Sequence, residues 1–386
     1  MNTCGVEKKC GACQLSNMDY ERQLRFKQAT VVKLLRRFGH VEEIIGMDEP
    51  YFYRNKAQYA VRKTRGNVVT GVYQSATGSA VITDKCFLND KTANSIVKYI
   101  RKLVVDQKIM PFDPKSGKGV LRHIMVRNAR STGEYMVVLV CFEDKLKNEE
   151  TLIKLLTKKF PEIKTVVLNV SKSAKMTLGA NERVLYGSGT IEDVLCGKRF
   201  EISSRSFYQI NPIQTEKLYQ KAAEFAALTG SERILDAYCG IGTIGITASD
   251  KAGSIVGVEK NGAAVYDARK NAEKNGIAKA EYIEADAAEY MQKAARSHER
   301  FDVVFTDPPR AGCSREFLAS LAFLAPKKVV YISCDPQTLA RDLLYLTHNG
   351  YKAEKIQPVD MFPHTRHVET AVLLSKIEIT GKKVKA

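Results

Sequence analysis

The sequence predicts an α/β protein with an N-terminal, mainly antiparallel α+β region and a C-terminal parallel sheet. Between residues 52 and 200, alternating or apolar strand-like runs are separated by Gly, Asn, Ser and Thr, which is typical of antiparallel strands. After residue 205 the pattern becomes strand, turn and helix in repetition, which predicts a parallel sheet. A chain of 386 residues, 44% of them hydrophobic, is long enough for two or three domains.

The expected elements follow in chain order. Apolar residues recur at helical spacing over residues 20–38, and Gly39 ends that helix. In the N-terminal region we expect strands over 58–63, 68–74, 124–129, 134–142 and 165–170, and helices over 94–105 and 149–160. In the C-terminal region we expect strands over 232–239, 253–260, 280–287, 301–307, 327–334 and 367–376. These patterns divide the chain into residues 1–40, 41–204 and 205–386.

Charge is distributed unevenly along the chain. The net charge is +17, and residues 1–200 hold 35 Lys and Arg against 20 Asp and Glu, whereas the remaining residues hold 25 against 23. This excess predicts a polyanionic partner such as nucleic acid for the first part. No apolar run reaches the roughly 20 residues of a membrane span, so we expect a cytoplasmic protein without a membrane partner. Nine cysteines without a secretory signal favour metal ligands, buried thiols or catalytic thiols over disulfides.

A glycine-rich turn indicates a nucleoside-binding site. Gly240, Gly242 and Gly245 form G-x-G-x-x-G between a strand and a helix, where the backbone can approach a ligand at a helix N-terminus. Glu259 ends the next strand, about 20 residues after the first glycine, where a carboxylate can accept both ribose hydroxyls. Both a nicotinamide dinucleotide and S-adenosylmethionine fit this pattern.

The following strands favour S-adenosylmethionine. Asp286 could contact an adenine, although a solvated turn or a helix cap would explain it equally well. The next strand delivers Asp307 in the motif D-P-P-R to the edge where ligands bind in open α/β sheets, which is typical of methyltransferases. Arg310 stands where amino-group methyltransferases carry an aromatic residue, which speaks against N-methylation.

Cys334 ends a further strand at the same edge and is a candidate nucleophile. It comes directly before Asp335 and Pro336, an N-cap and first position of a helix, whose positive end should lower the pKa of the thiol. The alternative is a buried, inert cysteine. A base could come from His364, His367 or Glu369, and spacing alone does not choose among them.

Five motifs together carry a resemblance to the RNA uracil-5-methyltransferase family: S-F-Y-Q-I-N, L-D-A-Y-C-G-I-G-T, D-P-P-R-A-G, I-S-C-D-P and H-V-E-T. The resemblance covers essentially the whole chain, with Y-R-N-K at 53–56 and L-R-H-I-M-V-R at 121–127 matching the family's central domain. It implies a Rossmann-like class I methyltransferase domain at residues 205–386. It also implies that Cys334 adds to carbon 6 of a uracil, that Glu369 removes the proton at carbon 5, and that both histidines orient their loop.

The resemblance also implies the cofactor site. Thr243 stands where relatives often have Asn, and Tyr238 could instead be simple core packing. Asp307 is expected near the uracil as well as the cofactor, and counts among the catalytic residues. The residues expected to bind S-adenosylmethionine are Gln209, Tyr238, Gly240, Gly242, Thr243, Glu259, Asp286 and Asp307.

A cysteine motif opens the chain. Cys4, Cys10 and Cys13 lie within one loop, and Cys86 could complete a set of four soft ligands suited to an iron–sulfur cluster or to zinc. Resemblance to part of the family favours a [4Fe-4S] cluster with a structural or RNA-contacting role, the alternative being unrelated free thiols. Many relatives begin with a small RNA-binding β-barrel called TRAM, and we expect this chain to lack it.

RNA recognition should therefore fall to residues 1–200 of a monomeric protein. The resemblance implies a uridine in 23S ribosomal RNA as the target, with transfer RNA as the alternative. An iron–sulfur RNA-binding protein without catalysis is a hypothesis of another class. Expected phosphate contacts are Arg54, Lys56, Arg62, Lys63, Arg122 and Arg127, and expected base-stacking side chains are Tyr53, Tyr59 and His123.

Overall fold

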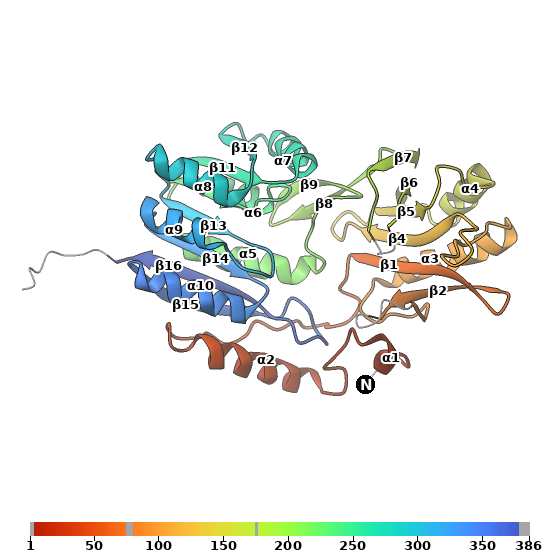
Figure 1. Ribbon diagram of the computed structural model, residues 1–386, viewed down its shortest axis with the longest axis horizontal. Helices are drawn as coiled ribbons and strands as arrows, with labels where there is room; N and C mark the ends of the chain where they lie inside the picture. The colour runs from red at the N-terminus through yellow and green to blue at the C-terminus, as the bar shows by residue number, and fades with distance from the viewer. Residues whose placement is uncertain (1–3, 75–79, 174–176, 378–386) are drawn as a thin grey trace, which may run out of the picture.

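Two seven-stranded sheets lie side by side in the computed structural model, which describes residues 4–74, 80–173 and 177–377 (Figure 1). The N-terminal sheet has the order β3-β2-β1-β4-β5-β6-β7. Its strands are β1 Lys56–Thr64, β2 Asn67–Tyr73, β3 Ala80–Ile82, β4 Leu121–Asn128, β5 Tyr135–Cys141, β6 Ile163–Val170 and β7 Asn181–Tyr186. All neighbours are antiparallel except β5 and β6, which α4 (Glu149–Lys159) connects by a crossover. The mainly antiparallel α+β prediction is confirmed.

One face of the N-terminal sheet is covered by α3 (Lys91–Asp106). Alternate residues of β1, such as Tyr59 and Val61, pack against Ile96 and Ile100 of this helix, and all four side chains are fully buried. Asp90 caps α3 by accepting a hydrogen bond from the amide of Ala93 at 2.8 Å. Side chains alternate across a strand, so the neighbours of these core residues point to the other face.

The C-terminal sheet has the order β12-β11-β10-β13-β14-β16-β15, which confirms the predicted parallel α/β fold. The first five strands are parallel, and β16 runs antiparallel to both β14 and β15. Its strands are β10 Arg233–Ala237, β11 Ser254–Glu259, β12 Ala280–Glu284, β13 Val303–Thr306, β14 Lys328–Ser333, β15 Tyr351–Val359 and β16 Glu369–Lys376. Its helices are α5 Pro212–Ala226, α6 Thr243–Ala248, α7 Gly262–Lys274, α8 Ala287–Arg296, α9 Arg315–Leu324 and α10 Pro336–His348.

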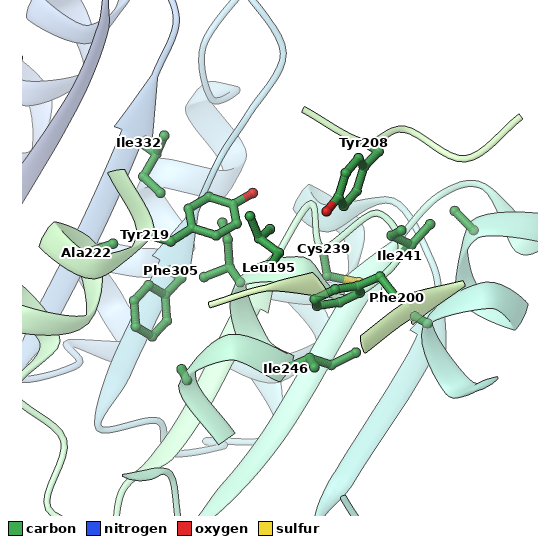
Figure 2. Close-up of a cluster of buried hydrophobic side chains, with 14 of the residues drawn as sticks. Leu195, Phe200, Tyr208, Tyr219, Ala222, Cys239, Ile241, Ile246, Phe305 and Ile332 are labelled. Atoms are coloured by element: carbon green, nitrogen blue, oxygen red, sulfur yellow. The ribbon is translucent and has the colours of Figure 1, made fainter. Parts of the chain in front are cut away.

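A hairpin of β8 (Thr190–Leu195) and β9 (Lys198–Ser203) joins the two sheets. Its inward side chains, including Leu195 and Phe200, pack in one core with Met125 of β4 and Phe305 of β13. Figure 2 shows this core extending to the glycine-rich turn. The hairpin therefore fixes the orientation of one sheet relative to the other.

The N-terminal segment packs against the C-terminal sheet. Helix α2 (Tyr20–Leu35) starts at its N-cap Asp19 and contacts β15 and α10, burying Val31 and Leu35. The chain after it pairs with β15 through bridges at Val41 and Ile45. The short α1 (Glu7–Cys10) instead lies under the N-terminal sheet (red, lower part of Figure 1). Within the described ranges, no helix combines the length and apolar character needed to cross a bilayer.

Candidate active site

The register of the C-terminal sheet brings the predicted site residues to one edge. Ala237 of β10 pairs with Thr306 of β13, and Ser333 of β14 pairs with Thr370 of β16. The residues that follow β10, β13 and β14 are therefore neighbours, as is the residue that precedes Thr370. These residues are Tyr238, Asp307, Cys334 and Glu369.

The glycine-rich turn and Glu259 form one side of this edge. Gly240 and Gly242 both have positive φ angles, 56° and 82°, and a Cβ on Gly242 would lie 2.9 Å from the hydroxyl of Tyr282. The amide of Gly240 donates to Oε2 of Glu259 at 3.2 Å, and the amide of Asn261 donates to Oε1 at 2.8 Å. The carboxylate is thus held beside the turn.

Asp236 is a buried carboxyl that the sequence analysis missed. Its Oδ2 accepts a hydrogen bond from the amide of Gly245 at 2.7 Å, which ties β10 to α6. Its Oδ1 has no hydrogen-bond partner among the described residues, and burial raises the pKa of this carboxyl to about 7. The sequence offered one signal for it, since Asp236 stands inside an otherwise apolar strand. A carboxyl is costly to bury, so its presence there indicates a specific partner or role.

Tyr238 and Thr243 flank the same turn, and Gln209 lies shortly before α5. Gln209 is 9% exposed, and its backbone carbonyl accepts a hydrogen bond from Asn55 at 2.9 Å. Tyr238 has a φ of 65° and packs on the ring of Phe317 at 5.6 Å. The hydroxyl of Thr243 lies 3.1 Å from that of Tyr219.

Asp286 is the N-cap of α8. Its Oδ1 accepts hydrogen bonds from the amides of Ala288 and Glu289 at 3.0 and 3.4 Å, and Oδ2 lies 3.7 Å from the ammonium of Lys260. The helix cap, one of the two expected explanations, is therefore present. A contact with adenine stays a prediction.

Cys334, Asp307 and Glu369 interact electrostatically at the sheet edge. Glu369 is 3% exposed and its Oε2 has no hydrogen-bond partner among the described residues. Burial, and then the Asp307 charge, raise the pKa of Glu369 well above its ordinary value, while burial raises that of Asp307. Both carboxyls therefore hold protons more readily than exposed ones.

The expected lowering of the Cys334 pKa is wrong. Burial of the half-buried thiol, followed by the nearby Glu369 and Asp307 charges, raises its pKa to about 11. Asp335 caps α10 as predicted, with Oδ1 2.8 Å from the amide of Gln337. Desolvation and two carboxyls act on the same thiol, and together they exceed the lowering of its pKa by the Arg310 charge and a backbone hydrogen bond.

Arg310 is a second residue whose place in the site the sequence analysis missed. Its positive charge partly offsets the rise in the pKa values of Cys334 and Glu369. One of its guanidinium nitrogens lies 3.4 Å from Nε2 of His367. The hydroxyl of Thr338 on α10 donates to the Arg310 carbonyl at 3.2 Å. The available signal was its position in the D-P-P-R motif at the end of β13.

His364 is engaged at both ring nitrogens. Nε2 lies 3.0 Å from the carbonyl of Pro50, Nδ1 lies 3.2 Å from the side-chain amide of Gln23, and the ring centroid lies 4.6 Å from that of the tilted Tyr51 ring. The side chain is 6% exposed, so it holds its loop and does not face the sheet edge as a free base.

The four predicted cysteine ligands line one cavity of about 930 Å³. Burial and the neighbouring Cys86 raise the pKa of Cys13 to about 12, and burial raises that of Cys4. Cys13 and Cys86 also pack together around Met47 and Tyr53. Within the described ranges, however, no three Cys, His, Asp or Glu side chains are arranged to hold a metal ion.

Several expected RNA contacts are wrong because the residues are buried. The predicted stacking rings Tyr53, Tyr59 and His123 are at most 2% exposed; Tyr53 donates to the Pro363 carbonyl and Tyr59 to Oδ1 of Asn94. The expected phosphate contacts Arg122 and Arg127 are 4% and 3% exposed, and they donate to the carbonyls of Ser171 and Ser206. Arg54 and Lys56 line the cysteine cavity, Arg62 is half-buried, and Lys63 is exposed.

A parallel sheet with this glycine-rich turn, acidic second-strand end and D-P-P motif defines an S-adenosylmethionine-dependent methyltransferase of the Rossmann-like class. A sequence profile of the tRNA (uracil-5-)-methyltransferase family matches residues 19–377. The chain belongs to this family and is an RNA methyltransferase.

Similar proteins agree with this assignment. An uncharacterized RNA methyltransferase of Clostridium acetobutylicum is 43% identical, over 97% of this chain and 83% of that protein. Another from Halalkalibacterium halodurans is 40% identical, over 96% and 82%. The crystal structure of Pyrococcus abyssi tRNA (uracil-54, C5)-methyltransferase with S-adenosyl-L-homocysteine superposes with a TM-score of 0.79 at 29% identity, covering 94% of this chain and 85% of that one.

Proposed function

We propose that this enzyme methylates carbon 5 of a uridine in RNA through a covalent bond between Cys334 and carbon 6 of the base. One observation carries the proposal: the β14–β16 register sets Cys334 and Glu369 side by side, with Asp307 and Arg310 next to both. Carbon 5 of uracil is a weak nucleophile. Addition of the thiolate at carbon 6 converts the ring into an enolate that can take a methyl group from a sulfonium.

Each residue then has a defined role. The Cys334 sulfur forms a bond to carbon 6, carbon 5 accepts the methyl group, and S-adenosylhomocysteine leaves. Glu369 removes the proton from carbon 5, after which the carbon–sulfur bond breaks and the double bond returns. Because Arg310 opposes the raised pKa values of Cys334 and Glu369, its charge favours the thiolate and the ionised base.

Trapping with 5-fluorouridine tests this mechanism, because fluorine at carbon 5 cannot leave as a cation. The enzyme, S-adenosylmethionine and target RNA containing 5-fluorouridine should give a methylated adduct that survives denaturing electrophoresis. Cys334→Ala should give none. Buried Cys313 and Cys239 serve as internal controls, and an adduct mapped to either of them would overturn the proposal.

For the cofactor we propose that Glu259 binds the ribose hydroxyls, with Gln209, Tyr238, Thr243 and Asp286 completing the site around Gly240 and Gly242. The position of the Glu259 carboxylate beside the turn supports this assignment. Glu259→Ala should weaken S-adenosylmethionine binding by about 10- to 100-fold, as expected for two lost charge-assisted hydrogen bonds. Calorimetry measures it, and unchanged affinity would contradict the assignment.

We also propose that Cys4, Cys10, Cys13 and Cys86 hold a [4Fe-4S] cluster. Four thiols on one cavity match the soft, sulfur-only donor set that such a cluster requires. Protein purified without oxygen should be brown and contain about four irons per chain, and Cys13→Ser should lower that content. Colourless protein with stoichiometric zinc would contradict the cluster, since zinc accepts the same four ligands.

We propose 23S ribosomal RNA as the target, an assignment supported by the resemblance of the cysteine motif alone. Similarity to the Pyrococcus enzyme favours transfer RNA as the second candidate. Mapping 5-methyluridine in both RNAs from cells that lack the gene decides between them. Loss from transfer RNA alone would reject the ribosomal assignment.

A further inference from the structure

The loop of residues 360–368 between β15 and β16 leads directly into Glu369. Five consecutive carbonyls of this loop accept hydrogen bonds from distant parts of the chain, all at 2.9–3.1 Å. The acceptor and donor pairs are Asp360 with Gln214, Met361 with Asn211, Phe362 with Lys27, Pro363 with Tyr53, and His364 with the amide of Leu15. The loop is therefore built into its surroundings rather than exposed as an ordinary connection.

A fully buried ion pair fixes the start of the loop. Nζ of Lys27 on α2 lies 2.5 Å from Oδ1 of Asp360, and neither side chain has any exposed surface. The hydroxyl of Tyr20 on the same helix donates to Oδ2 of Asp360 at 2.9 Å. Paired charges without solvent hold their partners in a narrow geometry, because separating them would leave each charge uncompensated.

The end of the loop is tied to the segment that carries the cysteine motif. Nε2 of Gln14 donates to the carbonyl of Gly11, between Cys10 and Cys13, at 2.9 Å, while its Oε1 accepts from the amide of Arg366 at 3.3 Å. Gln23 accepts from the amide of His364 at 2.9 Å. One short segment thus contacts both the cysteine loop and the residues just before Glu369.

We propose that residues 14–27 form a positioning element for Glu369, so that the N-terminal segment controls removal of the carbon 5 proton. This inference rests on the proposed role of Glu369. Proton transfer requires the carboxyl within hydrogen-bond reach of its target, and a displacement of about 1 Å can cost about 100-fold in rate. Cys334 and Asp307 follow strands β14 and β13 and lie outside this loop. The loop touches the Cys334 side of the site through the contact of His367 with Arg310, so addition and methyl transfer should depend on this element much less than proton removal does.

Full-length variants with ordinary uridine in the target RNA test this inference. Gln23→Met removes the bonds to His364, and Gln14→Ala removes an exposed bridge whose loss leaves the core intact. We expect adduct breakdown to slow about tenfold in the first and about threefold in the second. Adduct formation should change much less than breakdown, and S-adenosylmethionine affinity should stay unchanged. Glu21→Gln, at an exposed position of α2, is the matched control.

Hydrogen exchange of the peptide spanning residues 360–369 provides a second readout, and it should quicken in both variants. Faster exchange without adduct accumulation would overturn the positioning role, as would equal slowing of formation and breakdown. Glu369→Gln distinguishes failure of the proposed mechanism from failure of the positioning role of residues 14–27. If it fails to accumulate adduct, the proposed mechanism fails; if it accumulates adduct while the variants do not, only this inference fails.

Discussion

The C-terminal and N-terminal sheets differ in how far a position in the sequence predicts where a side chain lies. In the C-terminal sheet, Glu259 ends a strand, Cys334 and Asp307 follow strands, and all three reach one edge, as expected. In the N-terminal sheet, Tyr59 and His123 were expected on an RNA-binding surface and lie in the interior. Parallel strands present all their carboxyl ends at the same edge. An antiparallel sheet has two faces, and which one is covered depends on what packs against it.

This contrast predicts that conservative changes at the edge of the C-terminal sheet remove chemistry and leave the fold intact. Glu369→Gln should lower turnover by about 100- to 10,000-fold, the usual contribution of a positioned general base. The carboxamide keeps the volume of a nearly buried side chain, so thermal unfolding should change little. Multiple-turnover release of RNA containing 5-methyluridine and a melting curve measure both, and substantial residual turnover would break the contrast.

The opposite outcome is expected at a buried position of the N-terminal sheet. Tyr59→Ala should lower the free energy of unfolding by about 3–5 kcal/mol, because a fully buried ring leaves a cavity against α3. Tyr59→Phe should cost about 1 kcal/mol through the lost bond to Asn94 and leave RNA affinity unchanged. Urea titration and filter binding check this. Weaker RNA binding by Tyr59→Ala protein that remains folded would restore the stacking role.

The raised pKa of Cys334 sharpens the contrast, because the helix end was expected to lower it. Only the thiolate is alkylated, so in ligand-free protein the alkylation rate should rise about tenfold per pH unit from pH 7 to 9. The rise continues because the pKa is about 11. Mass spectrometry of iodoacetamide-treated protein follows Cys334 against buried Cys313. A rate that levels off below pH 8 would mean that the helix end dominates after all.

The smallest effect is expected at an exposed cation of the N-terminal sheet. Lys63→Ala should weaken RNA binding about two- to fivefold at low salt. The slope of log affinity against log salt concentration should become shallower by about one, which corresponds to one released counterion. Stability should not change, since this position is exposed. Lys279→Ala, an exposed cation before β12, is the comparison variant. Equal losses in the two variants would mean that the basic excess of residues 1–200 does not locate the RNA.

Local patterns were sufficient for the fold and for much of the candidate site. Periodicity predicted most of the long strands and the helices α2, α3 and α4, although β15, β7 and the β8–β9 hairpin were missed. The hairpin is short, and its packing depends on both sheets at once. Arg310 and Asp236 were visible in the motifs, but their roles depend on neighbours from other strands.

The sequence by itself determined the parallel sheet, the glycine-rich turn and the strand ends that carry Cys334 and Asp307, because these depend on residues close together in the chain. Only the tertiary structure decided how far Cys334 is buried and which charges surround it, and therefore that its pKa rises. It alone brought Lys27 onto Asp360, 333 positions away, and placed Tyr59 under α3. Burial and electrostatic interactions are sums over neighbours in space, and most of those neighbours are distant in sequence.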